Sequence, residues 1–245
     1  MLFKCMVAYD GSAYSGWQKQ PNHESIQENI EEALKTIHHK HIDIVGSGRT
    51  DAKVHAMGQV FHFESDNSMS MDAWKQALNR LLPKDIRILS IEQAPEDFHA
   101  RFSAVSKRYD YFISNDMDSP FLQHYMARDN RVLNVGLMSE AAKYLLGEHD
   151  FTTFTSSKIN AQKSRIKNIT ALEIVQHEKY IQMIFEGNGF LRYMVRMMAQ
   201  TLIEVGMGHL SPLQVKTMLE AKDKHICHYK ADPCGLYLVK VNYEE

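Results

Sequence analysis

The sequence predicts an α+β protein made of two similar halves, each with antiparallel strands and flanking helices. Two observations support this fold class. Short segments with alternating apolar residues are interleaved with longer segments whose apolar residues recur at helical spacing. The order of these segments after residue 105 also repeats the order before it. We therefore expect a first half at residues 1–105 and a second half at residues 106–245.

The first half is expected to contain two helices among four strands. One helix lies in "ESIQENIEEALKTIHHK", where Ser25 and Glu28 fit a capping box at its start. The other lies in "MDAWKQALNRLLP", with Trp74, Leu78 and Leu81 directed inward. The strands are expected at residues 2–8, 42–45, 59–64 and 86–91.

The second half is expected to contain three helices and four strands. The helices lie in "MSEAAKYLLGEHD", "GFLRYMVRMMAQTLIEVG" and "SPLQVKTMLEAK", and Ser211 with Pro212 marks the start of the last one. The strands are expected at residues 107–114, 169–175, 180–186 and 235–243, the second and third of them paired.

The composition limits the class of protein. With 44% hydrophobic and 24% charged residues, the chain has the composition of a soluble globular protein. No apolar run approaches the ~20 residues of a membrane span, and "MLFKCMVAYDG" lacks the apolar core of a secretory signal. Cys5, Cys227 and Cys234 follow no disulfide framework, so we expect free thiols in a reducing cytoplasm. A net charge of −2 does not indicate nucleic-acid binding, although it is compatible with a local basic patch.

The segment "GSGRTDAKVHAMGQVFHFE" places an acid just before a predicted strand. Asp51 follows Arg49 and Thr50 and precedes His55. An aspartate in a loop is most often a turn residue. The strand that follows would anchor the loop, so the other interpretation is an acid held in place for catalysis.

The segment "FLRYMVRMM" carries two arginines four residues apart. On a helix, Arg192 and Arg196 would project from the same side of a mostly apolar surface. One interpretation is a pair of solvated arginines. The other is a guanidinium held at a cleft, where it pairs with a carboxylate.

Two basic segments are candidates for RNA contact. In "ARFSAVSKRYDYFI", Tyr109 and Tyr111 would share one face of a strand, which is a base-stacking platform if open and part of the core if closed. The segment "TSSKINAQKSRIKNIT" contains cations without acids, which suits phosphates as well as a solvated loop. The candidate cations are Arg101, Lys107, Arg108, Lys158, Lys163, Arg165 and Lys167.

The motifs predict neither a metal nor a nucleotide cofactor. "HICHYKADPC" offers His225, Cys227, His228 and Cys234, but it has no C-x-x-C pair and no second ligand cluster at finger spacing. The chain contains no G-x-G-x-x-G or P-loop pattern.

Five motifs, in this order, resemble the tRNA pseudouridine synthase A family over nearly the whole chain. "SGRTDAKVHAMGQVFHF" is similar to the active-site pattern of that family, which is roughly G-R-T-D-x-G-V-H-A. The other four motifs are "YDGSAYSGWQKQP", "FHARFSAVSKRYDY", "GNGFLRYMVRMMAQTLIEVGMG" and "DPCGLYLVKVNY".

The resemblance implies a pseudouridine synthase fold of two α+β halves with a central catalytic cleft. It implies an isomerase that converts uridine to pseudouridine at positions 38, 39 and 40 of the tRNA anticodon arm, without a cofactor. The partners that it implies are tRNA and a second copy of the chain, in a cytoplasmic homodimer.

The resemblance also assigns roles to single residues. Asp51 matches the catalytic aspartate, and Arg49 would orient the loop and the RNA. Tyr109 matches the tyrosine that contacts the target base, and Arg196 matches the arginine that pairs with the aspartate. Lys53 and His55 are further candidate RNA contacts.

Two positions depart from the family pattern. Lys53 and Gln200 stand where the family usually has glycine. A glycine at position 53 indicates either a positive φ angle or a close approach of RNA to the backbone. Two alternatives stay open: a pseudouridine synthase with another RNA target, and a catalytically weak tRNA-binding paralogue. The missing C-x-x-C pair argues against a zinc-dependent deaminase.

Overall fold

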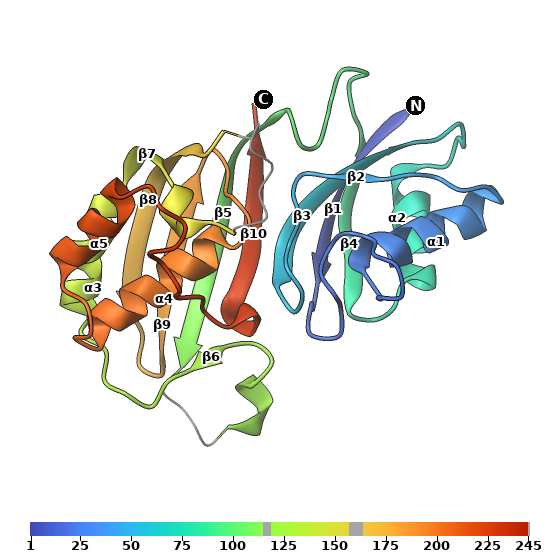
Figure 1. The fold of residues 1–245 in the computed structure, drawn as a ribbon. Coiled ribbons are helices and arrows are strands. Elements are labelled where there is room, and N and C mark those ends of the chain that lie inside the picture. Colours follow the sequence, from blue (N-terminus) through green and yellow to red (C-terminus); the bar gives the residue numbers. More distant parts are fainter. Residues whose placement is uncertain (115–118, 157–163, 245) are drawn as a thin grey trace. The chain divides into compact units, whose positions relative to one another are not determined.

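The computed structural model describes residues 1–114, 119–156 and 164–244, and its ribbon is drawn in Figure 1. The chain forms two compact units: Met1–Val105 with Tyr237–Glu245, and Ser106–Leu236. The last strand thus belongs mainly to the first unit, whereas the sequence assigned all of residues 106–245 to the second half. How the halves divide the function stays a prediction.

The first unit is built on a mostly antiparallel sheet. Strand β1 (Leu2–Tyr9) pairs with β3 (His55–Glu64) on one side and with β4 (Ile86–Gln93) on the other. The outer edge of β3 carries the short β2 (Val45–Gly46) and the parallel β10 (Leu236–Tyr243). The predicted strand at residues 42–45 is therefore reduced to two residues that enter the Asp51 loop.

Two helices cover the core of this unit. Helix α1 (Ile26–His38) begins as predicted, because the Ser25 side chain accepts a hydrogen bond from the Glu28 N–H. Helix α2 (Met71–Leu81) buries Trp74, whose ring lies 5.6 Å from that of Phe3.

The prediction that Leu81 points inward is wrong, since 43% of this residue is exposed. Leu81 is the last residue of α2, and the extended backbone of Leu82 turns the chain away immediately after it.

The second unit contains neighbouring antiparallel strands in the order β5 (Ala104–Ser114), β9 (Tyr180–Gly187), β8 (Ile166–Gln176) and β7 (Gly147–Asp150). A short strand, β6 (Ala127–Arg128), pairs with β5 in parallel. The helices are α3 (Val135–Ala142), α4 (Met194–Gly206) and α5 (Pro212–Glu220). The predicted pairing of residues 169–175 with 180–186 is confirmed, and so is the α+β class.

Two helix predictions in this unit need correction. The helix predicted at residues 138–150 ends at Ala142, and Gly147–Asp150 instead form β7 against β8. The helix predicted from residue 189 begins only at Met194, because Tyr193 takes a left-handed conformation with φ 66°. Over the described part of the chain, no helix is long and apolar enough to cross a membrane.

Candidate functional site

The Asp51 loop joins β2 to β3 in the first unit, and its backbone is tied to residues 14–17. The Trp17 N–H donates to the Thr50 carbonyl (3.2 Å), and the Lys53 N–H donates to the Tyr14 carbonyl (3.1 Å). A turn is closed by the Val54 N–H, which donates to the Asp51 carbonyl (3.2 Å). Thr50 and Val54 are buried, while Asp51 is partly exposed. The carboxyl group is thus carried by a braced turn.

Buried polar side chains of the neighbouring strands are hydrogen-bonded to the loop. The Tyr9 and Thr50 hydroxyls are hydrogen-bonded (2.8 Å), and burial raises the pKa of Tyr9 well above its usual value. The Ser47 hydroxyl donates to Gln59 Oε1 (2.6 Å), and Gln59 Nε2 donates to the Gly48 carbonyl (3.2 Å). These satisfied hydrogen bonds hold the loop in one conformation.

Two backbone positions in and beside the loop have positive φ angles. Gly16 has φ 97°, and a Cβ at this position would lie 2.6 Å from the Thr50 carbonyl oxygen. Lys53 has φ 64°. Of the two explanations for a glycine at this position, a positive φ angle or a close approach of RNA, this angle fits the first. Lys53 is also exposed.

His55, a predicted RNA contact, lies behind the loop with only 2% of its side chain exposed. Its Nδ1 lies 3.1 Å from the Gly11 nitrogen and 3.2 Å from Asp10 Oδ1. Its ring stacks on that of Tyr237 at a centroid distance of 4.6 Å. His55 is thus buried among Gly11, Asp10 and Tyr237 of the same unit, and its contact with RNA stays a prediction.

Arg196 lies in the first turn of α4, in the second unit, and is 8% exposed. Its Nε donates to the Ala231 carbonyl (2.8 Å), and the Ala231 N–H donates to the Arg196 carbonyl (3.0 Å). Arg192 precedes the helix and is exposed. The prediction that both arginines project from one side of a helix is therefore wrong.

Of the two alternatives for the tyrosines on β5, an open base-stacking platform or a closed face in the core, the structure shows the closed face. Tyr109 and Tyr111 are both buried, and the Tyr109 ring packs edge-on against Phe190 (5.2 Å). Burial raises the pKa of Tyr111 well above its usual value, as expected of a core hydroxyl.

Arg108 binds Asp110 through two hydrogen bonds of 2.8 and 2.9 Å. This contact raises the pKa of the arginine. The side chain of Arg108 is 34% exposed.

The other predicted RNA contacts are scattered over both units. Arg49 and Arg101 are exposed, and the Arg101 guanidinium lies 5.6 Å from the ring of Phe102, which is 75% exposed. Lys107, Arg165 and Lys167 are partly exposed. Lys158 and Lys163 lie outside the described residues.

The cysteines of "HICHYKADPC" make contacts within the protein. Cys227 is buried with its sulfur 3.6 Å from the Thr201 hydroxyl, and burial raises its thiol pKa. The Cys234 thiol donates to the Met126 carbonyl (3.6 Å). Both thiols thus contact oxygen atoms of the protein itself.

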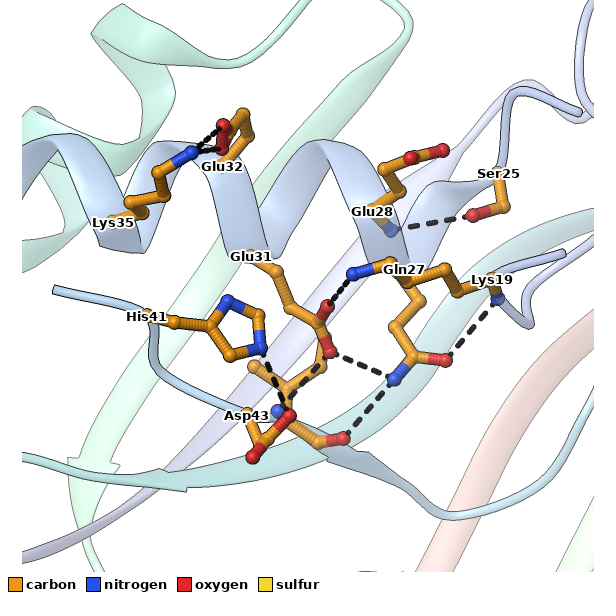
Figure 2. Close-up of polar contacts among 10 residues, drawn as sticks. Lys19, Ser25, Gln27, Glu28, Glu31, Glu32, Lys35, His41 and Asp43 are labelled. Atoms are coloured by element: carbon orange, nitrogen blue, oxygen red, sulfur yellow. Dashed lines mark hydrogen bonds and ion pairs between the residues drawn. The ribbon is translucent and has the colours of Figure 1, made fainter. Parts of the chain in front are cut away.

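A second group of side chains that could bind a metal ion lies at α1 and the segment after it (Figure 2). It consists of Glu31, His41 and Asp43. The buried Glu31 accepts a hydrogen bond from Gln27 Nε2 (2.8 Å) and lies 3.4 Å from the Lys19 ammonium, while His41 contacts Asp43 (3.0 Å). Because a lysine already faces the buried carboxylate, we assign Glu31 to the structure of this helix.

Sequence reasoning missed two residues beside Arg196. Tyr193 and Lys230 are placed there by a left-handed backbone turn and by the hydrogen bonds to Ala231. Neither feature has a local sequence signal, because both depend on contacts between distant segments.

Comparison with known proteins supplies the family context. A family described as tRNA pseudouridine synthase matches residues 5–103 and 141–244. A protein of Oceanobacillus iheyensis is 43% identical over 244 residues, covering 99% of this chain and 96% of its own length. One of Bacillus subtilis is 43% identical over 247 residues, covering 100% of both chains. Both relatives are named tRNA pseudouridine synthase A.

Proposed function

The chain belongs to the tRNA pseudouridine synthase family, and from this premise we propose that it isomerises uridine to pseudouridine at positions 38, 39 and 40 of the tRNA anticodon stem-loop. The observation that carries the proposal is the braced turn of Asp51, which holds one partly exposed acid within the matched motif. The similarity of full-length relatives named tRNA pseudouridine synthase A supports the same substrate.

The reaction rearranges the atoms of one uridine. The bond between C1′ of the ribose and N1 of uracil breaks, and a bond between C1′ and C5 forms. C5 loses a proton and N1 gains one, so no redox agent is needed. Asp51 acts either as the nucleophile or as the group that stabilises positive charge while the glycosidic bond is broken.

Other residues of the motif set would bind and orient the nucleotide. We propose that Tyr109 contacts the target base and that Arg196 keeps the aspartate ionised, since a nearby guanidinium favours the charged form of a carboxylate. Arg49 would orient the loop and the RNA. The proposed phosphate contacts are Lys53, Arg101, Lys107, Arg108, Lys158, Lys163, Arg165 and Lys167.

We further propose that the enzyme is a homodimer and works in the cytoplasm. Sedimentation equilibrium should give about twice the mass of one chain. A monomer that is fully active on tRNA would contradict the proposed dimer.

The test of the proposed function is a map of pseudouridine in unmodified tRNA transcripts after incubation with the purified protein. We expect product at uridines 38, 39 and 40 and at no uridine of the other arms. Product only elsewhere in the RNA would favour a synthase with another target. Binding without any product would favour the catalytically weak paralogue.

A further inference from the structure

Cations surround one tyrosine at the start of α4. Arg192 Cζ and Lys230 Nζ each lie 4.8 Å from the centroid of the Tyr193 ring, and Arg196 Cζ lies 5.6 Å from it. Arg192 and Lys230 are exposed, while Arg196 is buried. We refer to Arg192, Tyr193 and Lys230 as the Tyr193 cluster.

The backbone fixes the position of this cluster. Tyr193 is the N-cap residue of α4 with φ 66°, a left-handed conformation that is unfavourable for a bulky residue. Such a residue persists only where its surroundings hold it. Arg196 and Ala231 exchange hydrogen bonds of 2.8 and 3.0 Å, which bind the segment around Lys230 to the first turn of α4.

The cluster carries positive charge without a matching acid. Within the described ranges, neither Arg192 nor Lys230 is paired with a carboxylate. The N-terminus of a helix adds a partial charge of about +0.5, and Tyr193 supplies no side-chain cap to offset it. An aromatic ring stabilises an exposed cation only weakly, so the positive charge of Arg192 and Lys230 remains available to an anion.

The donors remain available to that anion. Arg192 uses one Nη2 hydrogen bond on the Tyr193 hydroxyl (3.0 Å), and the rest of its planar fork can face oxygen atoms. Lys230 adds a compact ammonium beside the same ring. A fork and a point charge held together suit the oxygens of a phosphate group.

We propose that the Tyr193 cluster binds a phosphate of the tRNA backbone, with Arg192 and Lys230 donating to its oxygens. The Tyr193 ring holds both side chains in place. This inference rests on the proposed function, because tRNA is the polyanion that brings the phosphate. Arg192, Tyr193 and Lys230 are not among the site residues that were assigned roles above, so the Tyr193 cluster is an additional binding subsite.

The test is a salt titration of binding to an unmodified tRNA transcript for the wild-type protein, Arg192→Gln and Lys230→Gln. Each substitution should weaken binding and make the slope of log affinity against log salt shallower by about 0.7–0.9, the value for one lost phosphate contact. Lys179→Gln is the matched control, an exposed lysine in the turn before β9 of the same unit. Its slope should equal that of the wild type.

A purely structural role of the cations predicts a different result. Arg192→Gln and Lys230→Gln would then lower the midpoint of thermal unfolding and leave the salt slope unchanged, which would overturn the proposal. Tyr193→Asn removes the aromatic ring but keeps the backbone conformation, because asparagine tolerates the left-handed conformation. We expect this variant to stay folded and to bind tRNA with a shallower salt slope.

The readouts keep this inference apart from the proposed function. Pseudouridine formation by the wild-type protein is measured on the same transcript. An inactive protein would count against the function, whereas an unchanged salt slope in an active enzyme counts against the Tyr193 cluster alone.

Discussion

Lys53 combines a strained backbone with an exposed charge. Its φ angle is 64°, and its N–H donates to the Tyr14 carbonyl. A left-handed conformation costs a lysine about 1 kcal/mol or more, whereas glycine adopts it without that cost. We infer that the ammonium offsets this strain by contacting a phosphate of the RNA.

Lys53→Gly should therefore separate stability from binding. The free energy of unfolding should rise by about 0.5 kcal/mol, because relief of strain exceeds the added freedom of the unfolded chain. The slope of log tRNA affinity against log salt should become shallower by about 0.7–0.9. Urea unfolding and a salt titration measure the two effects.

The matched control is Lys53→Arg, which keeps both the charge and the strain, so its slope and stability should equal those of the wild type. An unchanged slope for Lys53→Gly would show that the lysine points away from the RNA.

At the scale of elements, the first turn of α4 depends on a buried arginine. Arg196 donates to the Ala231 carbonyl and is 8% exposed. Arg196→Met keeps much of the side-chain volume but leaves that buried carbonyl without its donor. We expect a loss of about 1–3 kcal/mol in the free energy of unfolding, together with lost activity.

Chemical denaturation of Arg196→Met beside Arg192→Met measures this loss. Arg192 is exposed, so its substitution should change stability by less than about 1 kcal/mol. Equal unfolding free energies for Arg196→Met and the wild type would contradict the assigned role of the arginine.

A histidine on β3 makes the first unit sensitive to acid. His62 Nδ1 accepts a hydrogen bond from the Ala100 N–H (3.0 Å). Burial, and then the nearby His99, lower the pKa of His62, while Glu64 acts in the opposite direction. Lys4 faces it across the β1–β3 ladder. The neutral imidazole is thus the form that the folded state favours.

The sign of the pH effect follows from this lowered pKa. The contribution of His62 to stability is complete above the unfolded-state pKa of about 6.5 and is lost as the pH falls through the lower folded-state value. Unfolding by urea at neutral and acidic pH should show a larger loss for the wild type than for His62→Gln. The same loss in both proteins would assign the acid sensitivity to other groups.

Elements with local signals were predictable, and those fixed by distant contacts were not. Ser25 caps α1 through a hydrogen bond within one turn, so its start could be read from the sequence. The start of α4 could not, because the left-handed Tyr193 lies beside Lys230 and the Ala231 contacts. Helical periodicity also continued past Ala142, although pairing with β8 takes the chain into β7.

The same distinction holds for the whole molecule. The α+β class follows from alternating and helical patterns that each segment carries by itself. The place of β10 does not, because its parallel pairing of Tyr237 with His55 joins the last strand to β3, which lies far from it in the sequence. Asp51, taken alone, is an ordinary turn residue. Only the surrounding motif indicates catalysis, and the structure adds the braced backbone that a fixed acid requires.

We infer that Asp51, held by the hydrogen bonds of its turn, performs the isomerisation. Asp51→Asn keeps the size of the side chain and removes its charge. The variant should fold and bind tRNA nearly as the wild type does, while pseudouridine formation in a single turnover is abolished. Asp66→Asn, at a highly exposed acid of the same unit, is the control and should keep full activity.

The most direct measurement is the single-turnover rate of pseudouridine formation at saturating tRNA for Asp51→Asn, with filter binding on the same samples. We expect wild-type affinity and no detectable product. A rate within about tenfold of the wild type, equivalent to only about 1.4 kcal/mol of barrier, would contradict this expectation.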